Sequence, residues 1–268
     1  MKKLLTISTL AFVIATAALC ADQKPPAPKS KGESEALQAL FGATDPDARI
    51  KAADNLITKY ADTDFKALAL YFEAVSYQQK NDFEKMVVYG EQAIQADPKQ
   101  YAALLMLAKG IAQKTREFDL DKEEKLTKAE KYAKDGMAVL KDAPKPNAQV
   151  TDEQWAQAKK EYMAQGHEAL GFAASVRKNY DAAVPELKEA IEEFPDPVTM
   201  VRLAAVYDQS KKPDEALPIL EKVMATPDLH PSIRQFAQAE RVRALQLKSA
   251  GANPAPSAAP PQVEIKKQ

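Results

Sequence analysis

Residues 179–195 read NYDAAVPELKEAIEEFP, and the same pattern occurs three more times along the chain. The other copies are NDFEKMVVYGEQAIQADP at 81–98, KAEKYAKDGMAVL at 128–140 and KPDEALPILEKVM at 212–224. Aligned, they share a column of Met86, Ala129, Ala183 and Ala216, and seven residues later a column of Ala93, Gly136, Ala190 and Val223. Positions seven residues apart share one face of an α-helix. The pattern therefore predicts a repeated helix whose small residues let a neighbouring helix cross closely.

A second apolar stripe stands before each copy. Its residues recur at spacings of three and four, which is typical of an amphipathic helix. The stripes are Leu70, Ala74 and Tyr77; Leu104, Leu107, Ala108 and Ile111; Leu170, Gly171 and Ala174; and Met200, Leu203, Ala204 and Tyr207. No stretch alternates cleanly with a period of two, so the sequence offers no strand. Each repeat is therefore expected to be a pair of helices.

The interval between copies is not constant. Ala183 and Ala216 are 33 residues apart, whereas Met86 and Ala129 are 43 apart. We expect the extra residues of the second repeat at 115–125 (TREFDLDKEEK), where they extend a helix or form a polar loop on one edge of the array.

This arrangement resembles the tetratricopeptide repeat, a helix–turn–helix unit of roughly 34 residues with a Leu-Gly…Tyr…Ala…Phe…Pro pattern. The motif positions are filled here by Tyr77, Pro98, Leu170, Gly171, Ala183, Pro195, Tyr207 and Ala216. The resemblance covers about 65–225 and implies an all-α fold, a right-handed α-solenoid of antiparallel helix pairs. Helices at 33–41 and 45–60 would form a partial unit before it. A helix at 231–249 would be the C-terminal cap that covers the last apolar face.

Capping residues mark several helix starts. Asp45 and Asp196 each precede a proline, which suits an N-cap followed by the first helical position. Thr151 with Gln154 fits a capping box, in which each side chain bonds the backbone N–H of the other residue. We therefore expect helices to begin just after these three caps.

The composition is that of an ordinary soluble chain with few reactive side chains. Of 268 residues, 46% are hydrophobic and 28% are charged. Lys and Arg number 37 and Asp and Glu 38, so the formal net charge is −1, which argues against a broad nucleic-acid-binding surface. One Cys and two His leave little for metal or nucleophilic chemistry, and no phosphate loop or nucleophile elbow occurs.

Few residues offer catalysis or metal binding. His167 and His230 lack the spacing of metal ligands, so structural or exposed roles are expected. The acidic run at 119–123 is spaced like a calcium loop, but Glu124 stands where such a loop requires Gly. Glu161 and Glu168 are the carboxylates that an enzyme or small-molecule carrier could use, yet no paired acidic site is visible. We therefore expect no enzyme, no cofactor and no metal.

The first residues have the layout of a secretory signal peptide. Lys2 and Lys3 precede an apolar run at 4–19, and small residues around Cys20 and Ala21 offer a cleavage site. Processing there would leave a periplasmic or secreted protein. The domains expected are a signal peptide at 1–21, a Pro-rich linker at 22–32, the repeat domain at 33–249 and a disordered Pro/Ala-rich tail at 250–268.

An alternative retains Cys20 as a lipid-bearing residue. Leu19 stands where lipoproteins normally have a small residue before that Cys. The lipidated form would be an anchored envelope protein of an outer-membrane assembly or cell-division complex. The linker at 59–65 (KYADTDF) is similar to one found in bacterial tetratricopeptide proteins of those classes.

The resemblance implies a binding surface, because the first helix of each pair lines the concave face of such an array. The residues expected on that face are Leu68, Tyr71, Val75, Gln78, Leu105, Lys109, Phe172, Val201 and Asp208. Tyr71 and Phe172 would be its aromatic anchors. The expected function is an exported, non-enzymatic scaffold that binds a protein or peptide partner there, with no nucleic acid involved and with a membrane only if Cys20 carries lipid. The alternatives are the lipid-anchored envelope protein and a carboxylate-dependent enzyme or small-molecule carrier.

Overall fold

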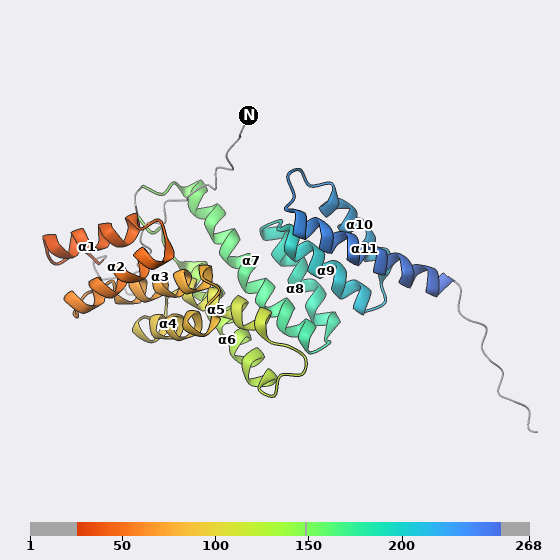
Figure 1. The fold of residues 1–268 in the computed structure, drawn as a ribbon, viewed down its shortest axis with the longest axis horizontal. Helices are drawn as coiled ribbons and strands as arrows, with labels where there is room; N and C mark the ends of the chain where they lie inside the picture. The colour runs from red at the N-terminus through yellow and green to blue at the C-terminus, as the bar shows by residue number, and fades with distance from the viewer. Residues whose placement is uncertain (1–25, 148, 253–268) are drawn as a thin grey trace, which may run out of the picture. The chain divides into compact units, whose positions relative to one another are not determined.

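The computed structural model describes residues 26–147 and 149–252, and this part of the chain is entirely helical, with eleven helices and no strand (Figure 1). The all-α prediction is therefore confirmed. The predicted signal peptide, Cys20 and the end of the predicted tail lie outside the described residues. Within the described part, no helix is both long enough and apolar enough to cross a membrane.

The helices fall into two compact units that meet in sequence at Phe194 and Pro195. In the first, each odd-numbered helix packs against the even-numbered helix that follows it. The first unit holds α1 (Lys31–Gly42), α2 (Pro46–Lys59), α3 (Lys66–Gln79), α4 (Phe83–Ala96), α5 (Tyr101–Lys114), α6 (Lys122–Asp142), α7 (Asp152–Val176) and α8 (Tyr180–Glu193). The second unit holds α9 (Pro197–Gln209), α10 (Pro213–Met224) and α11 (Pro231–Ala252), which packs against both of the others.

The predicted caps are present. The Asp45 carboxylate accepts a hydrogen bond from the Ala48 N–H at 2.9 Å, and Asp196 accepts one from the Thr199 N–H at 3.0 Å. At the start of α7, the Thr151 hydroxyl accepts from the Gln154 N–H, and the Gln154 side chain accepts from the Thr151 N–H. Local sequence signals thus fix where three helices begin.

Three helix pairs turn through the same backbone motif. Asn81, Lys178 and Lys211 follow α3, α7 and α9 and have φ of 58°, 61° and 59°, the left-handed conformation. After each, the next N–H donates back to the carbonyl five residues earlier: Asp82 to Tyr77, Asn179 to Ala174 and Lys212 to Tyr207. This Schellman-type ending satisfies helix carbonyls and reverses the chain in a few residues. A shared turn explains why the helix pairs are alike.

The two aligned columns lie at the helix crossings, as the repeat pattern predicts. All eight of their residues are buried. Glycines elsewhere on these helix pairs also allow close approach of the helices. A Cβ on Gly90 would lie 2.8 Å from Leu107, and a Cβ on Gly171 would lie 2.7 Å from Leu187. The register of the repeats is therefore confirmed by packing.

The α5–α6 pair carries the predicted insertion, divided between a loop and a longer helix. Residues 115–121 form the loop, and α6 then runs for 21 residues. The expected loop was polar, but Phe118 and Leu120 on it are the most exposed large apolar side chains of the described residues. The insertion thus presents apolar side chains to solvent, which polar composition alone did not indicate.

Candidate partner-binding surface

The helices α3, α5 and α7 supply the first-helix layer of the first unit, where the predicted binding residues should lie. The structure gives these residues unequal exposure. Gln78 is exposed, Val75 and Lys109 are half-buried, and Leu68, Tyr71 and Phe172 are buried. Val201 and Asp208, in the second unit, are buried as well. Their role in binding a partner stays a prediction, and the surface offered directly to solvent is narrower than the predicted set.

Leu105 lies inside the helix layer. Its side chain has no exposed area, and it approaches the backbone of α6 at Gly136 and of α7 at Gly166. A residue enclosed on two sides by neighbouring helices fills core volume. In this conformation Leu105 therefore has no surface that a partner could contact.

An aromatic cluster joins the three first helices. The Tyr101 ring of α5 meets the Tyr162 ring of α7 edge-on, with centroids 5.3 Å apart, and lies 6.2 Å from the Trp155 ring. The hydroxyls of Tyr71 and Tyr162 form a hydrogen bond. Burial raises the pKa of Tyr71 to about 12, so its hydroxyl stays protonated. Tyr162 is only partly buried, so the cluster reaches solvent at this residue.

Tyr101, Trp155 and Tyr162 were not among the predicted site residues. Trp155 packs on the preceding repeat: its indole N–H donates to the Ala143 carbonyl at 3.3 Å. Its link to the aromatic cluster depends on the length of α7, which has 25 residues. The signal available in the sequence was the spacing of Trp155 and Tyr162, seven residues apart on one helix face.

Comparison with known proteins identifies the repeat. The tetratricopeptide repeat family matches residues 67–100, which span α3, its turn and α4. A thermophilic TPR protein of Thermus thermophilus has a similar structure, with a TM-score of 0.54 at 17% identity over 78% of this chain and 99% of that chain. Residues 67–100 therefore form a tetratricopeptide repeat, and the chain has the fold of tetratricopeptide-repeat proteins.

Two further solved structures are more distant. A tetratricopeptide repeat protein of Parabacteroides merdae gives a TM-score of 0.41 at 15% identity, over 85% of this chain and 95% of that chain. An assembly chaperone of RpL4 gives 0.45 at 14% identity, over 85% of this chain and all of that chain. No curated protein matches the chain. Tetratricopeptide arrays are generally scaffolds for protein partners and carry no catalytic machinery of their own.

Charged side chains link neighbouring helices of the first unit. Lys109 of α5 forms an ion pair with Glu168 of α7, whose carboxylate is 4% exposed. His167 Nδ1 lies 2.8 Å from Glu186 Oε2 of α8, and this hydrogen bond raises the pKa of His167. Both contacts join helices that the repeat stacks, so Glu168 and His167 have structural partners, as expected for His167.

The structure brings together two acidic pairs that the sequence does not predict. Glu73 of α3 is fully buried near Asp54 of α2, and burial first, then Asp54, raises the pKa of Glu73 to about 8. Asp208 of α9 is 2% exposed, and burial first, then Glu240 of α11, raises its pKa to about 6. A general acid or base must reach its substrate. Because solvent does not reach Glu73 or Asp208, these pairs do not form a catalytic site in this conformation.

Asp208 also shows how the C-terminal helix alters the predicted surface. It was placed on the open concave face, but α11 packs on α9 and brings Glu240 and Arg243 near its carboxylate. The cap covers the position that the next repeat would otherwise occupy.

Within the described residues, no group of three or more His, Cys, Asp or Glu side chains could hold a metal ion.

Proposed function

We propose that this protein is an exported scaffold that binds a protein or peptide partner on the first-helix layer formed by α3, α5 and α7. One observation carries the proposal: the Tyr71–Tyr101–Tyr162 cluster joins the three first helices and ends in a partly exposed tyrosine. Aromatic side chains held rigidly beside polar ones are the usual anchors of protein interfaces. On the same helices, Val75 and Lys109 are half-buried and Gln78 is exposed.

Export is supported by the sequence at 1–21, with its basic start, apolar run and small residues before the linker. A chain of this kind would meet its partner outside the cytoplasm. Pulse labelling of the full-length chain tests this directly, because processing converts the precursor into a form about 20 residues shorter. Palmitate labelling of the same samples separates removal of Cys20 from lipidation. A precursor that is never processed and remains in the cytoplasm would overturn export.

The binding surface is tested with variants that spare the fold. Alanine at Tyr71 or Phe172 would remove buried rings and could unfold the unit, since such changes cost about 3–5 kcal/mol. Gln78→Ala removes an exposed amide, and Tyr162→Phe removes the hydroxyl of the partly exposed tyrosine. We expect each to weaken capture of the native partner several-fold, measured by crosslinking and affinity purification from the cell envelope.

The matched control is Gln95→Ala, which removes an exposed glutamine from α4, a second helix. It should leave capture unchanged. Capture that is insensitive to Gln78 and Tyr162 but lost on changing Gln95 would place binding outside the first-helix layer.

A further inference from the structure

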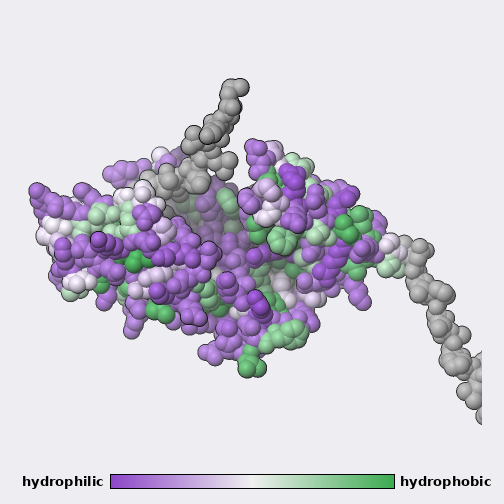
Figure 2. Space-filling model, in the orientation of Figure 1, coloured by the Kyte–Doolittle hydropathy of each residue, from purple (hydrophilic) through white to green (hydrophobic). Residues whose placement is uncertain are grey.

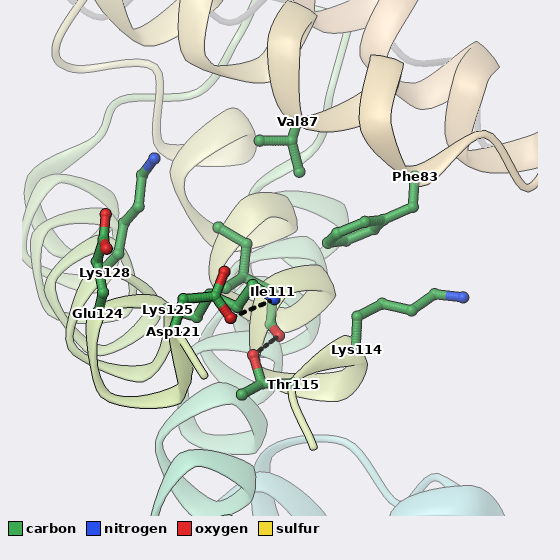
Figure 3. Close-up of a pocket in the computed structure, with 9 residues that line it drawn as sticks. All are labelled: Phe83, Val87, Ile111, Lys114, Thr115, Asp121, Glu124, Lys125 and Lys128. Atoms are coloured by element: carbon green, nitrogen blue, oxygen red, sulfur yellow. Dashed lines mark hydrogen bonds and ion pairs between the residues drawn. The ribbon is translucent and has the colours of Figure 1, made fainter. Parts of the chain in front are cut away.

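A pocket of about 250 Å³ opens between α4, α5 and α6 in the first unit (Figure 3). Phe83 and Val87 of α4 and Ile111 of α5 give it apolar walls. Pockets for small-molecule ligands typically measure about 300–1,000 Å³, whereas a cavity of about 150 Å³ accommodates a benzene ring. The pocket is therefore sized for one aromatic side chain.

The rim of this pocket is basic on one side. Lys114, Lys125 and Lys128 line it together with Asp121 and Glu124. Lys125 pairs with Asp121 at 2.8 Å, and Lys128 pairs with Glu91 of α4. Lys114 forms no ion pair with the described residues and instead lies over the Phe83 ring, 5.9 Å from its centroid. One positive charge at the mouth of the pocket is thus left for an acidic group.

The loop at 115–121 carries a side chain of the right size next to the pocket. Phe118 is 88% exposed and Leu120 is fully exposed. In Figure 2 this loop, at the lower edge of the view, forms a green patch on an otherwise mostly purple edge. Glu117 and Asp119 flank Phe118, so the loop offers an aromatic ring between two acids. Two large apolar side chains exposed on one loop form a candidate interaction surface.

The loop is held in place. Asp119 N–H donates to the Arg116 carbonyl at 3.2 Å, and the Arg116 N–H donates to the Asp119 carboxylate at 3.1 Å. From the end of α7, Lys178 pairs with Glu117 at 2.6 Å and the adjoining Arg177 pairs with Glu123 at 2.7 Å. An ordered loop loses little entropy when it binds. Phe118 is therefore presented to solvent by a fixed scaffold.

The geometry points to a second copy of this chain as the occupant, and we propose that two copies associate with Phe118 of each inserted into the Phe83–Val87–Ile111 pocket of the other. The loop runs between two pocket residues, Thr115 and Asp121, so the inserted ring and the pocket share one edge of the molecule. A two-fold axis at that edge forms both contacts at once and closes the assembly.

Charge favours the same arrangement. Glu117 and Asp119 pair within their own chain with Lys178 and Lys125, and beside the inserted ring they would also approach Lys114 of the other copy. Such rim pairs set orientation and suppress mismatched contacts more than they add affinity. Leu120 extends the apolar contact at the edge of the interface. This dimer surface uses α4, α5 and α6, and it goes beyond the partner binding proposed for the first-helix layer.

Photocrosslinking in cells that produce the full-length chain tests the dimer. The variant Phe118→p-benzoylphenylalanine places a reactive ring at the proposed insertion point. We expect an adduct of twice the chain mass, in which the probe is attached to a peptide containing Phe83, Val87 or Ile111. Mixing isotopically heavy and light chains shows that the two peptides come from different copies.

The matched control places the same probe at Phe236 of α11, a phenylalanine that is 67% exposed. It should give no adduct with the pocket peptides. Lys114→Glu in the Phe118 probe chain should lower the adduct yield about two- to fivefold, the effect of an exposed ion pair. No adduct, an adduct only with another protein, or an adduct with another part of the chain overturns the dimer.

Discussion

Asp54 of α2 lies near the fully buried carboxyl of Glu73 on α3, and Tyr77 and Tyr89 complete the surroundings of these two acids. Neither Glu73 oxygen has a hydrogen-bond donor among the described residues. Burial first, then Asp54, raises the pKa of Glu73 from 4.5 to about 8, so Glu73 is neutral in the folded protein at pH 7. The helix pair thus holds a protonated carboxyl in its core.

This carboxyl predicts a pH dependence of stability. Between pH 4.5 and about 8 the folded state binds more protons than the unfolded state, so the free energy of unfolding falls as pH rises through that window. One pKa unit corresponds to about 1.4 kcal/mol, which makes about 5 kcal/mol the upper limit. Glu73→Gln keeps the shape of a neutral carboxyl and should flatten the dependence, measured by urea denaturation at pH 5 and pH 8. An unchanged slope in the variant would show that Glu73 is charged in the folded state.

The Lys109–Glu168 ion pair between α5 and α7 predicts an asymmetric mutational effect. Lys109→Ala leaves the buried Glu168 carboxylate without this cation, and we expect a loss of about 1–3 kcal/mol in the free energy of unfolding. Replacing both residues with Met should recover most of the loss, because the buried charge disappears as well. Thermal or urea denaturation of the three variants measures this, and a double variant less stable than Lys109→Ala would contradict it.

Two helical glycines should respond differently to replacement by alanine, because only Gly171 lies at a helix crossing. A Cβ on Gly171 would meet the Leu187 side chain at 2.7 Å and the Leu187 backbone nitrogen at 3.3 Å, so Gly171→Ala should destabilise by about 1–3 kcal/mol. A Cβ on Gly42, in the last turn of α1, meets nothing within 4 Å. Gly42→Ala should therefore be neutral or slightly stabilising, by up to about 1 kcal/mol. Equal melting temperatures for the two variants would mean that the α7–α8 crossing is looser than described.

The repeat could be predicted from the sequence because several local signals agree. The columns through Ala183 and Ala216, the caps at Asp45 and Asp196 and the capping box of Thr151 all depend on a few neighbouring residues. The structure places each where the pattern indicates. Because these local signals agree with the global fold, the repeat can be predicted from the sequence alone.

The candidate surface was less predictable for physical reasons. Helix α5 is buried almost all round, from Tyr101 to Ala112, so its periodicity does not say which side faces a partner. The resemblance to the repeat family places Leu105 on the concave face, and the periodicity of α5 does not contradict that placement. Asp208 is covered by α11, and Tyr162 reaches Tyr71 across about 90 residues of sequence. These are tertiary contacts, which spacing along one helix does not contain.

The turn after α9 predicts a stabilising substitution in the second unit. Lys211 has φ of 59°, a conformation that costs residues with a Cβ about 1 kcal/mol or more, whereas Gly adopts it freely. Its N–H already donates to the Asp208 carbonyl at 3.0 Å, and Gly keeps that bond. Lys211→Gly should therefore raise the free energy of unfolding by about 0.5–1 kcal/mol, measured by urea denaturation.

The adjacent lysine is the control for that change. Lys212 has φ of −118°, which any residue adopts, and its side chain makes no capping bond to α10. Lys212→Gly adds only conformational freedom to the unfolded chain, so it should destabilise by up to about 1 kcal/mol. Opposite signs at two neighbouring lysines isolate the backbone conformation from charge, because both variants remove one positive charge. If both glycines destabilise equally, the left-handed turn at Lys211 is not strained, and the same conclusion would extend to its counterpart at Lys178.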